Sequence, residues 1–98
     1  MFHVVSTPQF DKEFNKLDPY IQKLLGAWIR KNLEGCSNPR ALGKALVGNH
    51  KGRWRYRIGD YRLICEIKDE ELVILAISVG HRSSIYLNEE ETIEQYGR

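Results

Sequence analysis

The stretch from Lys51 to Tyr86, KGRWRYRIGDYRLICEIKDEELVILAISVGHRSSIY, decides the fold of this 98-residue chain. It contains two hairpin signals in succession, which predict three consecutive antiparallel strands over residues 53–58, 61–68 and 72–82. Only Gly59 and Asp60 separate the first two runs, and a leading glycine in a two-residue loop favours a type II′ turn. A loop of this length fixes the register, so that Ile58 pairs with Tyr61 and the flanking residues pair in step.

The predicted register sorts the side chains of this first hairpin onto two different faces. Side chains alternate along a strand, and directly opposed residues share a face. One face is apolar enough to be the core side: Trp54, Tyr56, Ile58, Tyr61, Leu63 and Cys65. The other, called here the arginine face, carries Arg53, Arg55, Arg57 and Arg62. Scattered charges usually mark a solvated surface, but like charges opposed in a ladder repel, so this face indicates an anion site. Arginine suits phosphate because its planar fork donates paired hydrogen bonds.

The third run is nearly all apolar, which is typical of a central strand covered on both faces. We assign its all-aliphatic alternate set to the core and its small or polar set to the arginine face. The first set is Val73, Leu75, Ile77 and Val79, and the second ends in Ser78, Gly80 and Arg82. With this parity Arg82 and Arg62 flank one concavity, and Ser78 and Gly80 leave room between them.

The net charge of +2 is unevenly distributed along the chain. Residues 36–59 contain six lysines and arginines and no carboxylate, whereas residues 89–98 are acidic. A basic patch on a nearly neutral protein indicates a localised polyanion site. The candidate RNA- or phosphate-binding residues are therefore Lys44, Lys51, Arg53, Arg55 and Arg57.

The remaining sequence predicts one domain, residues 1–98, of the α+β class. A short edge strand over residues 2–5 precedes a helix that Ser6 and Gln9 would cap as a capping box. Asp18-Pro19 ends that helix and caps a longer one that Gly35 ends. Its apolar stripe, expected to pack on the core side of the sheet, is Ile21, Leu24, Leu25, Trp28, Ile29 and Leu33. A short turn is expected around residues 42–47, and Asn88 would cap a last helical turn through Tyr96.

Several kinds of site are absent from the sequence pattern. Cys36 and Cys65 share no metal spacing, and two free thiols fit a reducing cytoplasm. The sequence shows no signal peptide, membrane span, P-loop, dinucleotide fingerprint or metal motif, so no cofactor and no membrane attachment are expected. Considered alone, His81 at a strand end and Tyr86 beyond it are more often structural than catalytic.

The runs WRYRIGDYRLICEI and VILAISVGHRSSIY resemble the RelE/ParE superfamily of bacterial toxin–antitoxin toxins. The two-helix hairpin and Leu46-Val47-Gly48 match too, so the resemblance covers nearly the whole chain. It implies two helices packed on a small, about four-stranded antiparallel sheet. It also implies a cytoplasmic hetero-oligomer in which a cognate antitoxin, RelB-like or similar, wraps and neutralises the toxin.

The resemblance also implies an activity. RelE-like members cleave mRNA in the ribosomal A site without a metal, through attack of a ribose 2′-hydroxyl on the adjacent phosphate. By motif, Arg62 of GDYR matches an arginine that stabilises the transition-state phosphate, and Arg82 of VGHR matches one that assists the leaving oxygen. Tyr86 matches a tyrosine that stacks on or orients the substrate. The ribosome and mRNA are the partners implied.

One departure from RelE proper leaves the proton transfer open. Arg55 and Arg57 stand at strand positions where RelE has lysines, one of them linked to proton abstraction. An arginine is a poor general base, because its pKa lies above about 12. Either these arginines only bind phosphate, or His81 takes the proton, since histidine titrates near neutral pH.

Two other functions remain open beside the ribosome-dependent endoribonuclease. The chain could be a ParE-like inhibitor of DNA gyrase with no nuclease chemistry, or a non-catalytic relic that binds only nucleic acid or its antitoxin. Gyrase poisons of the superfamily generally lack the full set of Arg62, Arg82 and Tyr86 with a histidine beside the second arginine. Its presence here favours the nuclease.

Overall fold

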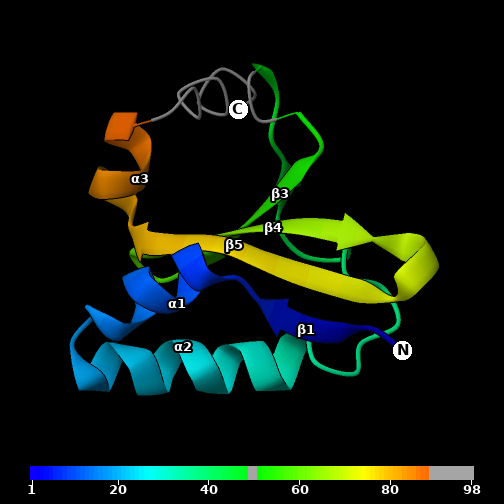
Figure 1. Ribbon diagram of the computed structural model, residues 1–98, viewed down its shortest axis with the longest axis horizontal. Helices are drawn as coiled ribbons and strands as arrows, with labels where there is room; N and C mark the ends of the chain where they lie inside the picture. The colour runs from blue at the N-terminus through cyan, green and yellow to red at the C-terminus, as the bar shows by residue number, and fades with distance from the viewer. Residues whose placement is uncertain (49–50, 89–98) are drawn as a thin grey trace.

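A computed structural model of the protein describes residues 1–48 and 51–88 (Figure 1). The chain begins with β1 (His3–Ser6) and the helices α1 (Pro8–Asn15) and α2 (Pro19–Asn32). It continues through β2 (Lys44–Ala45), β3 (Arg53–Ile58) and β4 (Tyr61–Lys68), then a 3-10 turn (Asp69–Glu71), β5 (Val73–His81) and α3 (Arg82–Asn88). In the described ranges no helix is long and apolar enough to cross a membrane.

The strands form one sheet in the order β1-β5-β4-β3-β2. The predicted α+β class is confirmed, with α1 and α2 on one side of the sheet and α3 on the other (Figure 1). The sheet has five strands where about four were expected, and it is mixed because β1 pairs parallel to β5. The fifth strand is β2, only two residues long, which lies where the sequence predicted a turn.

Each of the two N-terminal helices begins with a proline that directly follows the capping residue. Thr7, not Ser6, caps α1: its hydroxyl accepts from the Phe10 N–H at 3.2 Å and donates to the Ala76 carbonyl at 2.8 Å. Ser6 is unavailable because it still pairs with Ala76 in the β1–β5 ladder, so the predicted capping box was wrong. The predicted cap of α2 is confirmed, since the Asp18 carboxylate accepts from the Tyr20 N–H at 3.1 Å.

The core lies between α1, α2 and one face of the sheet. Its fully buried members include Leu25 from α2, Leu33 at the C-cap of α2, and Tyr56, Leu63 and Cys65 from the β3–β4 hairpin. Leu24 was wrongly included in the apolar stripe, because 43% of its surface is exposed. Cys36 and Cys65 are both free thiols, as expected, and burial raises the pKa of the Cys65 thiol.

The register of the β3–β4 hairpin is confirmed pair by pair, from Ile58 opposite Tyr61 to Trp54 opposite Cys65. The parity predicted for β5 is correct only for its second half. Opposite Ile64 and Cys65 a β-bulge shifts the β4–β5 register, so that Ser78 faces Ile64 but Ala76 faces Cys65. A bulge inserts one unpaired residue and exchanges the faces beyond it. The buried residues of the first half are therefore Ile74 and Ala76, not Val73 and Leu75.

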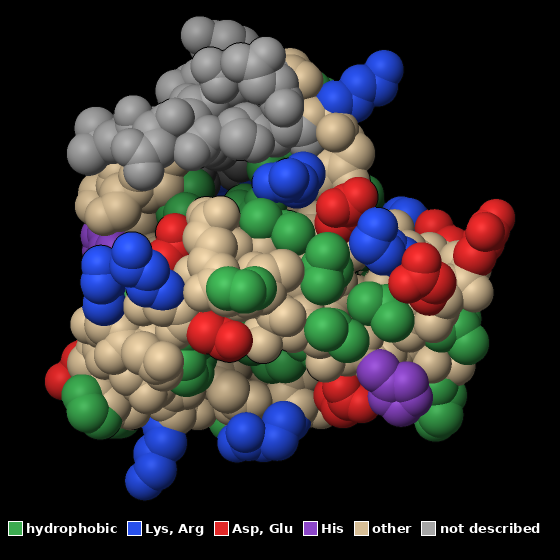
Figure 2. Space-filling view, viewed as in Figure 1, with side chains coloured by type: hydrophobic (Ala, Val, Ile, Leu, Met, Phe, Trp, Pro, Cys, Tyr) green, Lys and Arg blue, Asp and Glu red, His purple; other side chains and the backbone are tan. Residues whose placement is uncertain are grey.

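The surface seen in Figure 2 carries hydrophobic side chains gathered over its middle, among charged groups of both signs. The exposed large hydrophobic residues of the described chain include Val5 on β1 and Leu72 before β5. Contiguous apolar surface on a small protein commonly marks a contact with another macromolecule.

Candidate cationic site on the outer sheet face

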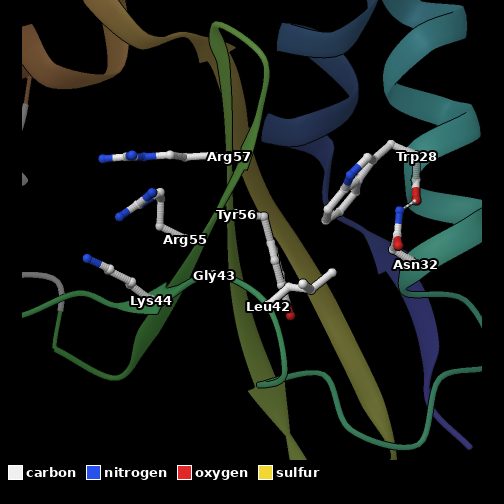
Figure 3. Close-up of a pocket in the computed structure, with 8 residues that line it drawn as sticks. All are labelled: Trp28, Asn32, Leu42, Gly43, Lys44, Arg55, Tyr56 and Arg57. Carbon is white, nitrogen blue, oxygen red and sulfur yellow. Dashed lines mark hydrogen bonds between the residues drawn. The ribbon is translucent and has the colours of Figure 1, made fainter.

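Four cationic side chains from three strands share the outer face of the sheet. Lys44 pairs directly with Arg55, and Arg57 pairs directly with Arg62. Opposed residues project to the same side, so these four lie on the face remote from α2. Figure 3 shows Lys44, Arg55 and Arg57 on one side of β3, with Tyr56 and Trp28 on the other.

Two of these arginines are buried rather than exposed on a solvated face. Arg55 is 2% exposed and Arg62 is 5% exposed, whereas Arg57 is open to solvent. The expectation that Arg55 lies outside the buried interior was therefore wrong. β2 pairs with β3 at Arg55 through Lys44 and does not extend to Arg57. Burying a guanidinium group without polar contacts costs free energy, so the polar contacts of these two side chains hold them in place.

The guanidinium of Arg62 is oriented by the β3–β4 turn. Its Nη1 donates to the carbonyls of Gly59 and Tyr61, each at 2.9 Å. Opposite Arg62 on β5 stands Gly80. A Cβ at Gly80 would lie 3.7 Å from the buried side chain of Ile85, so α3 packs over this end of the arginine face.

Arg53 and Lys51 are less closely associated with this group. Arg53 pairs directly with Glu66 on β4, so its charge has a carboxylate on the same face. Lys51 is exposed in the turn before β3. The predicted phosphate-binding residues thus divide into a close set, Lys44, Arg55 and Arg57 with Arg62, and two residues at its margin.

The structure does not place His81 with the arginines. His81 pairs with Tyr61, whose neighbours Leu63 and Cys65 face the core, and the two rings meet edge to face at 5.5 Å. The Ser83 N–H donates to His81 Nδ1 at 3.1 Å, which leaves Nδ1 as an acceptor and ties the ring to the start of α3. The Ser83 hydroxyl lies 2.9 Å from the same nitrogen.

Arg82 and Tyr86 belong to α3, a helix that the sequence analysis did not predict. Arg82 is exposed at its first position, and its N–H donates to the Asp60 carbonyl at 2.8 Å, beside the Gly59-Asp60 turn. Tyr86 is described only by its backbone. The predicted last turn from Asn88 to Tyr96 lies outside the described residues, apart from Asn88 at the end of α3.

A cavity of about 440 Å³ adjoins the cationic group along the outer edge of β3 (Figure 3). It is lined by Lys44, Arg55 and Arg57 and by Trp28, Asn32, Leu42, Gly43 and Tyr56. The loop approaches β3 closely at Gly43, where a Cβ would lie 2.4 Å from the Arg55 carbonyl oxygen. The apolar stripe predicted that Trp28 lies wholly in the core; it is half-buried and also borders this cavity. The helical stripe gives no signal for that second role.

A second cavity, of about 320 Å³, lies where α1 meets β5 and includes Glu13, Tyr61 and His81. Glu13 accepts from the Ser78 hydroxyl at 2.7 Å and from the Val79 N–H at 2.9 Å. The second bond gives a partner to a backbone N–H of β5 that lies beyond the end of its pairing with β1. Within the described chain no three His, Cys, Asp or Glu side chains gather as a metal site would require.

Residues 4–86 match the family described as the ParE toxin of type II toxin–antitoxin system, parDE. A putative RelE-like toxin protein of Escherichia coli is 32% identical over 78 residues, which cover 76% of this chain and 79% of that protein. Toxin RelG of Mycobacterium tuberculosis is 32% identical over 76 residues, covering 76% of this chain and 84% of that toxin.

Solved structures share the fold. One is the toxin–antitoxin complex RelBE2 of Mycobacterium tuberculosis, with a TM-score of 0.75 and 28% identity over 82% of this chain and 96% of that one. The isolated E. coli RelE toxin gives a TM-score of 0.65 at 22% identity, over 98% of this chain and 99% of RelE, a likeness of fold alone. The family match spans most of the sequence, and both relatives are named as toxins. This chain therefore belongs to the RelE/ParE superfamily, as a toxin of a type II toxin–antitoxin system.

Proposed function

We propose that this toxin is a ribosome-dependent endoribonuclease that cleaves mRNA by attack of a ribose 2′-hydroxyl on the neighbouring phosphate. The observation that carries the proposal is the group of Lys44, Arg55, Arg57 and Arg62 on one sheet face. Negative charge builds on the phosphate oxygens during such an attack, and fixed cations stabilise that charge more than they stabilise the ground state.

Arg62 has the features needed to stabilise the transition state. Its guanidinium is held by two turn carbonyls and is almost fully buried. A donor that is already oriented needs no reorganisation when charge develops on the phosphate, which is the source of catalytic electrostatic stabilisation. Arg82, exposed at the start of α3 beside the same turn, is assigned to the leaving oxygen by its motif.

The positions of the arginines and of His81 favour one of the two roles left open by the sequence. Arg55 and Arg57 bind phosphate and do not act as bases, because guanidinium groups keep their proton, so the proton of the attacking 2′-hydroxyl passes to a water molecule. His81 lies on the helix side of the sheet and contacts Ser83 through Nδ1, so we assign it a positioning role at the start of α3. Tyr86 keeps the substrate-orienting role implied by its motif.

Inhibition of DNA gyrase is the second candidate, and the family description that matches residues 4–86 favours it. A gyrase inhibitor would use the same cations as a docking surface without cleaving RNA. Two assays on the purified chain separate the candidates. Primer extension on mRNA translated in its presence should show cuts within codons, and supercoiling by gyrase should be unaffected. Uncut mRNA with blocked supercoiling would replace the nuclease by the gyrase inhibitor.

We also propose that an antitoxin, RelB-like or similar, covers the arginine face in a hetero-oligomer. Solved neighbours of this fold are toxin–antitoxin complexes. A partner that neutralises the toxin should supply carboxylates to the cations and apolar side chains to exposed residues such as Val5 and Leu72. Gel filtration of the co-expressed neighbouring gene products should give one complex; separate elution of the toxin would refute this assignment.

A further inference from the structure

The cavity along the edge of β3 has two chemically different walls (Figure 3). Lys44, Arg55 and Arg57 form its cationic side, while Trp28, Asn32 and Leu42 lie on the opposite side of β3. A ligand that meets both sides must reach round the edge of β3, with an anionic group at one end and a mostly apolar group at the other.

The apolar wall is suited to a flat ring. Trp28 is half-buried, and its ring contacts that of Tyr56 with the centroids 5.6 Å apart and the planes tilted by 56°. Leu42, which also lines the cavity, is 45% exposed. The Leu42 carbonyl accepts from Trp54 Nε1 at 2.7 Å, which fixes the loop that carries this side chain. An indole supported in this way is a stacking surface for another aromatic ring.

Asn32 gives this wall a hydrogen-bond acceptor. Its Nδ2 donates to the Trp28 carbonyl at 3.0 Å, as the dashed line in Figure 3 shows. A carbonyl only accepts, so the amide nitrogen must face it, and the Oδ1 atom is turned away from that carbonyl. A ligand group that meets Oδ1 must donate a hydrogen bond.

The cationic wall is continuous with the arginine face. Lys44 is exposed, and its strand partner Arg55 lines both the cavity and the group proposed to bind phosphate. A phosphate held there by Lys44 and Arg57 would leave its attached nucleoside at the mouth of the cavity. The volume of about 440 Å³ is in the range of small-ligand pockets and is ample for one nucleotide.

We infer that this cavity is a base-binding subsite, in which Trp28 stacks on the base of a nucleotide adjoining the bound phosphate and Asn32 Oδ1 selects a base with an exocyclic amino group. Adenine, cytosine and guanine each carry such a donor, whereas both exocyclic atoms of uracil are carbonyl oxygens. The inference rests on the proposed function, because it takes RNA as the ligand of the arginine face. It adds to that function a determinant of which nucleotide is accepted.

Binding of a trinucleotide that cannot be cleaved tests this subsite directly. The purified full-length chain is titrated with labelled 2′-O-methyl trinucleotides that differ only in the middle residue: adenine, uracil or an abasic site. We expect the adenine form to bind roughly 5- to 150-fold more tightly than the abasic form, the range for stacking one base on an aromatic side chain. Uracil should fall between them.

Substitutions in each wall of the cavity test which side chains cause the base-dependent binding. Trp28→Ala should make the adenine and abasic forms bind alike, and Asn32→Leu should bring adenine and uracil together. Lys44→Ala should weaken all three forms equally. Tyr20→Ala is the matched control, because Tyr20 is an aromatic residue of the same helix that is 69% exposed and does not line the cavity. If Trp28→Ala does not fold, Leu42→Ala, a loop variant, should still reduce the adenine–abasic difference.

The outcomes separate this inference from the proposed function. Equal binding of all three trinucleotides by the wild-type chain, together with cleavage of translated mRNA, would overturn the subsite and leave the nuclease standing. Base-dependent binding through Trp28 without mRNA cleavage would support the subsite and refute the nuclease. If Trp28→Ala weakens only a glutamate-rich peptide carrying one phenylalanine, the cavity is a peptide site and the inference is wrong.

Discussion

At the scale of single residues, the arginine face contains cations in two different environments. Arg57 is exposed, whereas Arg55 and Arg62 are buried to within a few per cent. The sequence predicted their shared face because a two-residue loop fixes the register. It did not predict their burial, because alternation along a strand assigns a side chain to a face but does not say how far that face is covered. The carboxylate of Glu66 opposite Arg53 does follow from the same register when it is extended by one pair.

Arg62→Ala should lower single-turnover cleavage by roughly 10²–10³-fold, the usual cost of losing one preorganised donor at a developing negative charge. Ribosome association should change much less, since the other cations remain. Rapid-quench cleavage and ribosome pelleting measure the two quantities. Arg62→Lys controls for charge, and equal losses in binding and cleavage would assign Arg62 to binding alone.

Arg57 and Arg55 should respond differently to removal of their charge. Arg57→Ala should leave the free energy of unfolding within about 0.5 kcal/mol and reduce the dependence of RNA affinity on salt by about one phosphate contact. Arg55→Ala should cost about 1–3 kcal/mol of stability because it empties a buried position. Arg55→Met, which keeps the aliphatic bulk, should lose affinity without that cost. Denaturant melts and salt titrations measure both, and an unchanged salt slope in Arg57→Ala would remove it from the site.

His81→Ala distinguishes a positioning role from proton transfer. If His81 only holds the start of α3 through Ser83, the variant should cleave more slowly at every pH with an unchanged profile. A histidine base would instead give a pH–rate profile whose inflection near neutrality disappears in the variant. The pH–rate profiles of the wild-type and variant chains decide between the two roles. Loss of the inflection in the variant would contradict a positioning role for His81.

At the scale of elements, the sequence predicted the two helices and the three long strands, because each carries a clear period or a decisive turn. The prediction failed where one inserted residue changes the pairing between two strands. The β5 bulge lies within a run so apolar that either parity looks acceptable, and nothing local marks it. The parallel pairing of β1 was missed for a similar reason: a four-residue strand carries no sequence signal that distinguishes parallel from antiparallel pairing.

Glu34 ties the edge strand β1 to the end of α2, and this link should depend on pH. Its carboxylate accepts from the Val4 N–H at 2.9 Å and lies 2.7 Å from His3 Nδ1, contacts that lower its pKa. A carboxyl with a lowered folded pKa stabilises the fold above its ordinary pKa, and the contribution is lost as pH falls through the folded value. Thermal melts should therefore show Glu34→Gln less stable than wild type near pH 6 and closer to it below pH 4. A constant difference across that range would contradict the link.

At the scale of the whole molecule, the two faces of the sheet differ in their chemistry. The face toward α1 and α2 is packed with aliphatic and aromatic side chains, and the other face gathers cations from β2, β3 and β4. We propose that this second face catalyses attack by a ribose 2′-hydroxyl.

The chemistry of the cut ends tests that claim most directly. mRNA translated in the presence of the wild-type chain is cut, and the 3′ ends of the upstream fragments are identified by mass spectrometry, with Arg62→Ala as the matched control. Attack by the 2′-hydroxyl predicts a 2′,3′-cyclic phosphate or a 3′-phosphate, at a rate that Arg62→Ala greatly lowers. A 3′-hydroxyl would contradict the account, because it requires a different nucleophile.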